Sequence, residues 1–92
     1  IKSFKAKETE KVFQRKFSRK LPQNIQKTAY RRLALLHSAK ELRDLLVPPS
    51  NQLEKLYRDR TGQYSIRIND QWRICFKWQD GDACEVEITD YH

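Results

Sequence analysis

The chain has 92 residues and a mass of 11.1 kDa, which predicts a single domain, residues 1–92, with one modest hydrophobic core. Charged residues make up 34% of the chain, and no apolar run approaches the roughly 20 residues of a transmembrane helix, so no membrane association is expected. Lys2, Lys5 and Lys7 interrupt any secretory signal pattern, and we expect a cytoplasmic protein.

The charge of the chain is unevenly distributed. Lys and Arg total 19 and Asp and Glu 12, for a net charge of +7. Residues 1–50 carry 13 basic and 4 acidic side chains, whereas residues 51–92 carry 6 and 8. This excess favours a polyanionic partner such as nucleic acid or the ribosome. Lysines that only solubilise amphipathic helices are the alternative.

The first half of the chain is predicted to be mainly helical. Residues 1–6 alternate weakly and suit an edge strand. Helical periodicity then predicts helices over residues 7–17 and 23–37 and one more turn within residues 39–46, before Pro48 and Pro49 end any helix. The core stripes of the two helices are Val12, Phe13 and Phe17 in the first and Ile25, Ala29, Leu33 and Leu36 in the second.

The second half changes from helical to strand periodicity. Strands are predicted over residues 53–57, 63–68, 72–78 and 83–91. Three of them share one apolar face, made of Tyr64, Ile66, Ile68, Trp72, Ile74, Phe76, Trp78, Cys84, Val86 and Ile88. The fold class expected is therefore α+β, with an N-terminal strand and two helices packed on a C-terminal antiparallel sheet of three to four strands.

The apolar face also predicts the register of the sheet. Pairing Ile66 with Ile74 keeps both on one face and requires a three-residue connection, Asn69–Gln71, with one residue in the left-handed region. The same reasoning predicts a turn at Asp80–Asp82 that places Phe76 opposite Val86.

Two further consequences follow from this second turn. Lys77 should lie opposite Glu85, and the two charges compensate each other. Cys75 and Cys84 should face opposite sides of the sheet, so no disulfide is expected. Neither has a Cys or His partner at the short spacings of zinc sites, so no metal site is expected.

The predicted register brings Arg67 directly opposite Arg73, beside Thr89. Two opposed arginines repel each other unless an anion lies between them, so they form a candidate phosphate site. The alternative is that each guanidinium reaches a nearby carboxylate such as Asp70 or Glu87. The candidate RNA- and phosphate-binding residues are Arg67, Arg58, Arg60 and Lys77.

The last three residues, Asp90-Tyr91-His92, lie at the end of the final strand, next to Arg73 and Thr89 in the predicted register. The imidazole of His92 has a pKa range suited to proton transfer at neutral pH, and a frayed terminal histidine is the alternative. Tyr91 could stack on a base or pack in the strand. Glu54, Arg73 and His92 are the residue types that RNA cleavage by the substrate's own 2′-hydroxyl needs, and that reaction requires no cofactor and no metal.

The segment from Gly62 to Phe76 (GQYSIRINDQWRICF), followed by the terminal Asp90-Tyr91-His92, resembles HigB toxins of the RelE superfamily. The resemblance extends over residues 25–92. It implies a small RelE-like domain acting as a type II toxin, an mRNA interferase. Such an endoribonuclease cleaves mRNA in the A site of the 70S ribosome, inhibits translation and is neutralised by a HigA-like helix-turn-helix antitoxin.

The resemblance assigns roles to matching positions. The arginine of the family's Trp-Arg pair falls on Arg73, and its terminal triplet falls on Asp90, Tyr91 and His92. The implied roles are transition-state clamp for Arg73, general acid for His92 and base for Glu54, with Tyr91 and Asp90 orienting substrate or His92. The basic N-terminal half would hold ribosomal RNA.

One stretch departs from the family pattern, and other classes of function stay open. Leu56-Tyr57-Arg58-Asp59 stands where the family has Leu-Lys-Gly-Asp, so an attenuated toxin is a hypothesis, with Arg58 or Arg60 able to replace the missing charge. The alternative function is a non-catalytic basic module that binds RNA, the ribosome or a protein. A sequence-specific DNA repressor is a weaker third reading, because no recognition helix stands out.

Overall fold

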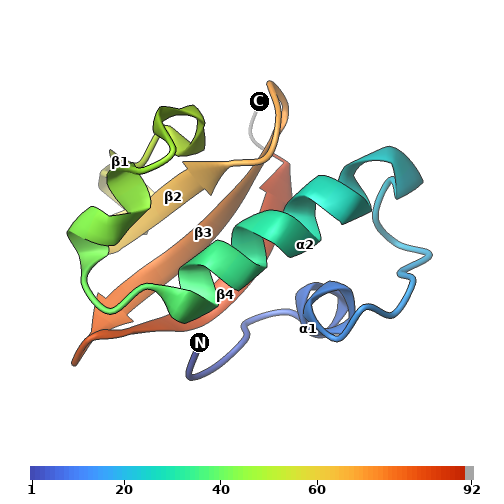
Figure 1. Cartoon of the computed structure of the whole chain (residues 1–92), viewed down its shortest axis with the longest axis horizontal. Coiled ribbons are helices and arrows are strands. Elements are labelled where there is room, and N and C mark those ends of the chain that lie inside the picture. Colours follow the sequence, from blue (N-terminus) through green and yellow to red (C-terminus); the bar gives the residue numbers. More distant parts are fainter. Residues whose placement is uncertain (91–92) are drawn as a thin grey trace.

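Helices cover one face of an antiparallel sheet in the computed structural model, which describes residues 1–90. The elements in chain order are α1 (Lys7–Phe13), α2 (Gln23–Ser38), η1 (Leu42–Leu46), η2 (Pro49–Asn51), β1 (Glu54–Lys55), η3 (Arg58–Arg60), β2 (Gln63–Arg67), β3 (Trp72–Gln79) and β4 (Asp82–Asp90). The sheet order is β1-β2-β3-β4, with every neighbouring pair antiparallel. Figure 1 shows α2 lying across the sheet, with α1 beside it. The α+β prediction is confirmed.

Within residues 1–90, no helix is long and apolar enough to cross a membrane.

The core lies between α2 and the sheet. The predicted stripe of α2 is buried, and it consists of Ile25, Ala29, Leu33 and Leu36. It packs against the sheet residues Ile66, Ile68, Ile74, Phe76, Ala83, Val86 and Ile88. Burying one such large apolar side chain stabilises the fold by about 1.5–3 kcal/mol, so this face fixes the register of the strands.

The first helix ends four residues earlier than its apolar stripe predicts. Arg15 adopts a left-handed φ of 60°, and its N–H donates to Val12 O at 3.0 Å. Lys16 N donates to Lys11 O at 2.8 Å, which closes the helix. Phe17 therefore leaves the helix and is 61% exposed, instead of joining the core.

The N-terminal segment covers the free edge of β4. Phe4 forms a parallel bridge with Val86, and Val86 N donates to Ser3 O at 3.1 Å. Further along, Ile88 N donates to the buried hydroxyl of Thr9 at 2.9 Å. The predicted edge strand is thus an isolated bridge, and it pairs backbone groups that would otherwise stay open to another chain.

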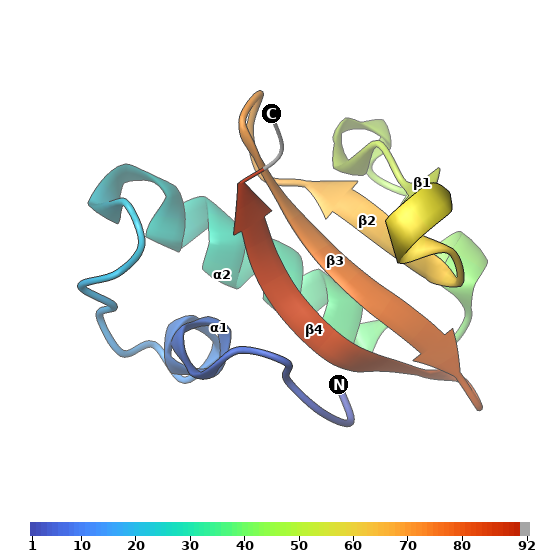
Figure 2. The ribbon, with the colours of Figure 1, turned by 180° about the vertical axis from the view of Figure 1, so that it is seen from behind.

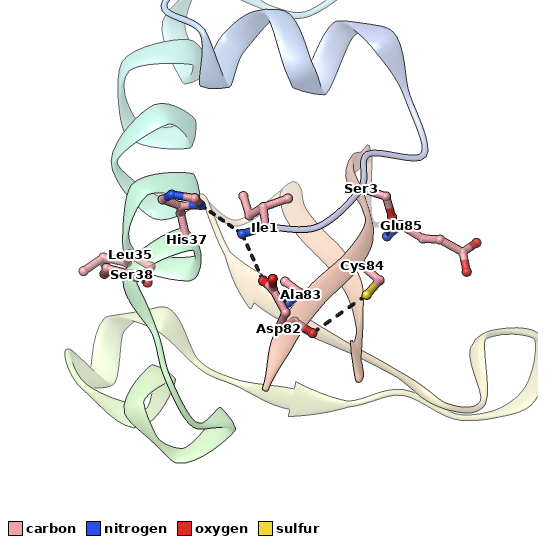
Figure 3. A network of polar contacts seen from close by, with 9 residues as sticks. All are labelled: Ile1, Ser3, Leu35, His37, Ser38, Asp82, Ala83, Cys84 and Glu85. Atoms are coloured by element: carbon pink, nitrogen blue, oxygen red, sulfur yellow. Dashed lines mark hydrogen bonds and ion pairs between the residues drawn. The ribbon is translucent and has the colours of Figure 1, made fainter. Parts of the chain in front are cut away.

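Polar contacts at the other end of β4 are seen in Figure 3. The backbone nitrogen of Ile1 lies 2.9 Å from His37 Nδ1 and 3.0 Å from Asp82 Oδ1. Glu85 N donates to Ser3 Oγ at 2.9 Å. These contacts join the start of the chain to the last turn of α2 and to the first residues of β4.

The predicted register of β2 and β3 is confirmed. Ile66 pairs with Ile74 and Arg67 with Arg73, and Asn69–Gln71 makes the connection. No residue of this connection has a positive φ, so the left-handed residue predicted there is wrong. The side-chain oxygen of Asn69 instead accepts from Gln71 N at 2.9 Å and Trp72 N at 2.7 Å, and this Asx turn reverses the chain without left-handed backbone.

The predicted register of β3 and β4 holds only up to Cys75. Gln79 pairs with Asp82, so the connection is the two residues Asp80 and Gly81, both at positive φ, as a type I′ turn requires. A β-bulge at Glu85, whose φ is 50°, absorbs the difference.

The bulge changes which β4 side chains share a face. Lys77 pairs with Cys84 and not with Glu85. Cys84 therefore lies on the face of Cys75, and Ala83 takes its place in the core. The prediction that the two cysteines face opposite sides is wrong, although both thiols are free.

Candidate active site

The candidate site lies on the face of the sheet that α1 and α2 leave uncovered, which faces the viewer in Figure 2. Arg73, the second residue of β3, stands on this face opposite Arg67 of β2 on one side and Thr89 of β4 on the other. The predicted placement of Arg67 and Thr89 on either side of Arg73 is confirmed.

The guanidinium of Arg73 is held by neutral oxygens. Its Nε donates to Ser65 Oγ at 2.7 Å, and its Nη2 donates to the carbonyl oxygen of Gln52. Arg73 is 7% exposed and Ser65 fully buried. The arginine is thus fixed in orientation before any substrate arrives.

Within residues 1–90, Glu54 is the carboxylate within ion-pair distance of Arg73. It belongs to β1, which has only two residues where five were expected, and it pairs with Ser65. Its Oε1 lies 3.9 Å from Arg73 Nη2, and its side chain is 52% exposed. The structure therefore brings Glu54, Ser65 and Arg73 together, with the carboxylate on the solvent side.

The loop before β1 completes this arrangement. Asn51 is buried, donates from Nδ2 to Leu45 O at 3.1 Å and accepts from Arg32 on α2. The next residue, Gln52, takes a left-handed φ of 44°, which points its carbonyl oxygen at Arg73. The residue that follows the Pro48–Asn51 segment thus supplies a hydrogen-bond acceptor for Arg73.

Most of the predicted phosphate-binding cations are paired with carboxylates. Three ion pairs are formed: Arg67 with Asp70, Arg60 with Glu87 at 3.0 Å, and Lys77 with Glu85 at 2.8 Å. The repulsion between Arg67 and Arg73 is therefore reduced by the carboxylate and neutral oxygens of the protein that bind them, which is the alternative to a bound anion. The pairs of Arg67 and Lys77 each include an exposed carboxylate, and such pairs contribute only about 0–1 kcal/mol, so a phosphate group can compete for these two cations.

The segment between β1 and β2 contains Leu56-Tyr57-Arg58-Asp59, the stretch that departs from the family's sequence pattern. Tyr57 is 71% exposed, and Arg58 is exposed with a left-handed φ of 59°. Arg60 turns toward the sheet, where its Nη1 also donates to Gln63 at 3.1 Å. Of the two arginines proposed to replace the family's lysine, Arg58 is thus the one that extends into solvent.

The end of β4 lies beside the connection between β2 and β3. Asp90 pairs with Trp72, and its Oδ2 accepts from Gln71 Nε2 at 3.1 Å. Strand alternation places Asp90 on the opposite face from Thr89, and thus from Arg73. Tyr91 and His92 lie outside the described residues.

Two titratable groups near the site have perturbed pKa values. Burial raises the pKa of the Cys75 thiol, so it stays protonated at neutral pH and adds no negative charge beside Arg73. The hydrogen bond and positive charge of Lys77 lower the pKa of Glu85. Within residues 1–90, no cluster of three or more His, Cys, Asp or Glu side chains is placed to hold a metal ion.

The comparison with known proteins gives the family. The family profile described as "RelE-like toxin of type II toxin-antitoxin system HigB" matches residues 2–92. The chain belongs to this family. The match begins well before residue 25, where the resemblance seen in the sequence starts, so α1 and the segment before it belong to the family fold.

Relatives of this HigB-family chain cover most or all of it. Toxin HigB-1 of Vibrio cholerae is 38% identical over 70 residues, which are 76% of this chain and 74% of that protein. Endoribonuclease HigB of Proteus vulgaris is 33% identical over 95 residues, covering 100% of this chain and 99% of that protein. A chain of the YoeB-YefM complex from Staphylococcus aureus shares the fold, with a TM-score of 0.63 at 22% identity over 100% of this chain and 95% of that one.

Proposed function

We propose that this HigB-family chain is a ribosome-dependent, metal-independent endoribonuclease that cleaves mRNA in the ribosomal A site. The observation that carries the proposal is the preorganised Arg73, fixed by Ser65 and Gln52 with Glu54 within 4 Å of its guanidinium. Family membership and the 33% identical relative named Endoribonuclease HigB support the same reading.

The proposed reaction uses the substrate as its own nucleophile. The 2′-oxygen attacks the adjacent phosphorus and loses its proton to Glu54, while the bond from phosphorus to the 5′-oxygen breaks. His92 gives the leaving oxygen its proton, so the products are a 2′,3′-cyclic phosphate and a 5′-hydroxyl. Arg73 stabilises the negative charge that grows on the phosphoryl oxygens, and donors of this kind contribute about 10²–10³ in rate.

The other candidate residues have supporting roles in this proposal. Tyr91 and Asp90 orient the substrate or His92, and Arg67, Arg58, Arg60 and Lys77 attract the phosphates that flank the scissile bond. Glu54 suits the role of base because its carboxylate lies 3.9 Å from Arg73 Nη2 and its half-exposed side chain can reach the 2′-hydroxyl.

The partners proposed are the 70S ribosome, mRNA and a HigA-like antitoxin, and the cytoplasm is the compartment in which they meet. The surplus positive charge of residues 1–50 suits contact with ribosomal RNA. The structural relative was solved as the YoeB-YefM complex, and an antitoxin partner for this chain is proposed on the family's toxin-antitoxin description.

One observation favours the non-catalytic alternative, a basic module that binds RNA, the ribosome or a protein. The cations without carboxylate partners lie mostly on the helical side of the molecule, whereas those around Arg73 are largely neutralised. A binding module would need only the first group, and it would tolerate the loss of Arg73 and His92.

Cleavage of a defined mRNA with and without programmed 70S ribosomes separates the two functions. Primer extension maps the 5′ ends for the parent chain, Arg73→Ala and His92→Ala, with Arg43→Ala as a control at an exposed position outside the site. We expect cleavage only with ribosomes, lost in the two site variants and kept in the control. Ribosome binding by all four proteins without any cleavage would support the binding module and contradict the proposal.

A further inference from the structure

The segment just before β1 forms hydrogen bonds with groups from both sides of the sheet. Arg32 on α2 donates from Nη1 to Asn51 Oδ1 and from Nη2 to Ser50 Oγ, the second at 3.2 Å. One residue further along, the carbonyl oxygen of Gln52 accepts from Arg73 Nη2. Because α2 covers one face of the sheet and Arg73 stands on the other, this short segment connects the helical layer to the candidate active site.

The side chain of Asn51 is the centre of this connection. Asn51 is fully buried, and its Nδ2 donates to Leu45 O at 3.1 Å and to Val47 O at 3.4 Å. Its Oδ1 accepts from Arg32, and the charge of the guanidinium makes that bond stronger than one between neutral groups. A buried amide without its partners is strongly unfavourable, so these contacts hold Asn51 in one orientation.

The backbone of Gln52 needs such an anchor. Its φ of 44° and ψ of 57° lie in the left-handed region, which is unfavourable for residues other than glycine. Its N–H donates to Pro49 O at 3.0 Å, and the residue before it is the buried Asn51. A residue stays in this region only where its surroundings fix it. The direction of the Gln52 carbonyl, and with it the orientation of Arg73, therefore depends on Asn51.

We infer that Arg32 and Asn51 are positioning residues for the proposed cleavage. Arg32 fixes the amide of Asn51, and Asn51 fixes the loop whose Gln52 carbonyl orients Arg73. The inference rests on the proposed nuclease function and extends it to two residues that act through Gln52 and not by contact with the substrate. A displacement of about 1 Å in a catalytic group slows a reaction by about 100-fold, so even partial release of this loop changes the rate.

The alternative role for Arg32 is that of one more basic residue that attracts ribosomal RNA. Its contacts favour positioning, because both terminal nitrogens donate to oxygens of the loop and the side chain is half-buried. The preceding residue of α2, Arg31, is exposed. Arg31→Ala therefore removes the same charge from the same helix and is the matched control for Arg32→Ala.

Single-turnover cleavage on programmed 70S ribosomes, measured at a series of chain concentrations, separates the two roles. We expect the rate at saturation to fall at least about tenfold in Arg32→Ala and in Asn51→Ala, and to stay at the parental value in Arg31→Ala. Loss of attraction to RNA should change the half-saturating concentration equally in the two arginine variants. The double variant of Arg32 and Asn51 should be no slower than Asn51→Ala alone, because the first residue acts through the second.

Two results of this cleavage series would overturn the inference. One is an Arg32→Ala variant that changes only the half-saturating concentration, as Arg31→Ala does. The other is a double variant whose loss is the product of the two single losses, because independent sites combine in that way. Urea unfolding confirms that each variant is folded, and Arg32→Ala decides alone if Asn51→Ala does not fold.

NMR of protein labelled with ¹⁵N-arginine measures the hold on Arg73 without ribosomes. Its Nε–H donates to the buried Ser65, and the signal is assigned by its loss in Arg73→Ala. We expect this proton to exchange with water at least about tenfold faster in Arg32→Ala than in the parent chain, with no change in Arg31→Ala. Unchanged exchange in a folded Arg32→Ala variant would overturn the inference. A parent chain that does not cleave would contradict the nuclease proposal, and the exchange rates would still decide whether Arg32 positions Arg73.

Discussion

Ser65 gives the most informative single substitution in the structure, because it connects folding stability to the candidate site. Its hydroxyl accepts the hydrogen bond from Arg73 Nε at 2.7 Å, and both residues are buried. Ser65→Ala removes that acceptor and leaves a charged donor in a place that water scarcely reaches. The side-chain volume hardly changes, so the substitution tests the hydrogen bond and not the packing.

The expected cost follows from the nature of this bond. A hydrogen bond to a charged group contributes about 1.5–3 kcal/mol, and Gln52 O still holds Nη2 of Arg73 in the variant. We therefore expect the free energy of unfolding to fall by about 1.5–3 kcal/mol. For a domain of this size that corresponds to a Tm lower by roughly 6 to 24 °C. Cleavage should also slow, because Arg73 loses one of the contacts that orient it.

Urea unfolding and single-turnover cleavage measure these two effects. The matched control is Ser50→Ala, since Ser50 Oγ also accepts from an arginine, Nη2 of Arg32 at 3.2 Å, but at an exposed position. The control should cost less than about 0.5 kcal/mol. Equal costs for the two variants would refute the reasoning that burial makes the Ser65 contact strong.

Three further predictions concern other parts of the chain. Glu85→Gly should stabilise the fold by about 0.5–1 kcal/mol, because glycine tolerates the φ of 50° and only an exposed ion pair with Lys77 is lost; a lower urea midpoint would contradict this. Ser18→Ala removes the hydrogen bond that lowers the pKa of Glu8 below 4.5. When folding lowers the pKa of a carboxyl group, that group stabilises the fold fully at pH values above its ordinary pKa, and the contribution is lost as the pH falls through the folded pKa. The difference in free energy of unfolding between parent and Ser18→Ala should therefore be full at pH 7 and narrow below pH 4.5. A constant difference in unfolding series from pH 7 to 3 would refute this cause. Tyr57→Lys restores the family's lysine and should speed single-turnover cleavage, and no gain would count against an attenuated toxin.

The parts of the fold that follow from alternation could be predicted from the sequence. Ile66 and Ile74 must share the buried face, and that requirement alone places Arg67 opposite Arg73. The helical stripe of α2 gives the covering layer in the same way. Such predictions succeed because a slip by one residue would turn the whole apolar set toward solvent.

The β-bulge at Glu85 was missed because the prediction assumed uninterrupted alternation along β4. The sequence did contain a signal, since Asp80-Gly81 suits a two-residue type I′ turn. That turn and a core position for Val86 are compatible only if β4 holds one extra residue. A conflict between turn type and alternation is thus itself an indication of a bulge.

The surroundings of Arg73 were only partly predictable. Glu54 was identified by residue type and by resemblance, and Ser65 shares the face of Arg73 by alternation, yet nothing marked it as the acceptor for Nε. The carbonyl of Gln52 could not be foreseen, because it depends on a left-handed backbone at a non-glycine residue. The end of α1 was missed for the same reason, since Arg15 adopts that conformation too.

Stabilisation of the scissile phosphate by Arg73 is the central step of the proposed reaction, and single-turnover cleavage of an A-site codon on programmed 70S ribosomes tests it. The two variants are Arg73→Ala and Arg67→Ala. The two arginines oppose each other on one sheet face, but neutral oxygens hold Arg73, whereas the exposed carboxylate of Asp70 holds Arg67. We predict a rate at least about 100-fold lower for Arg73→Ala and less than about tenfold lower for Arg67→Ala. A folded Arg73→Ala variant that cleaves at the parental rate would contradict the account.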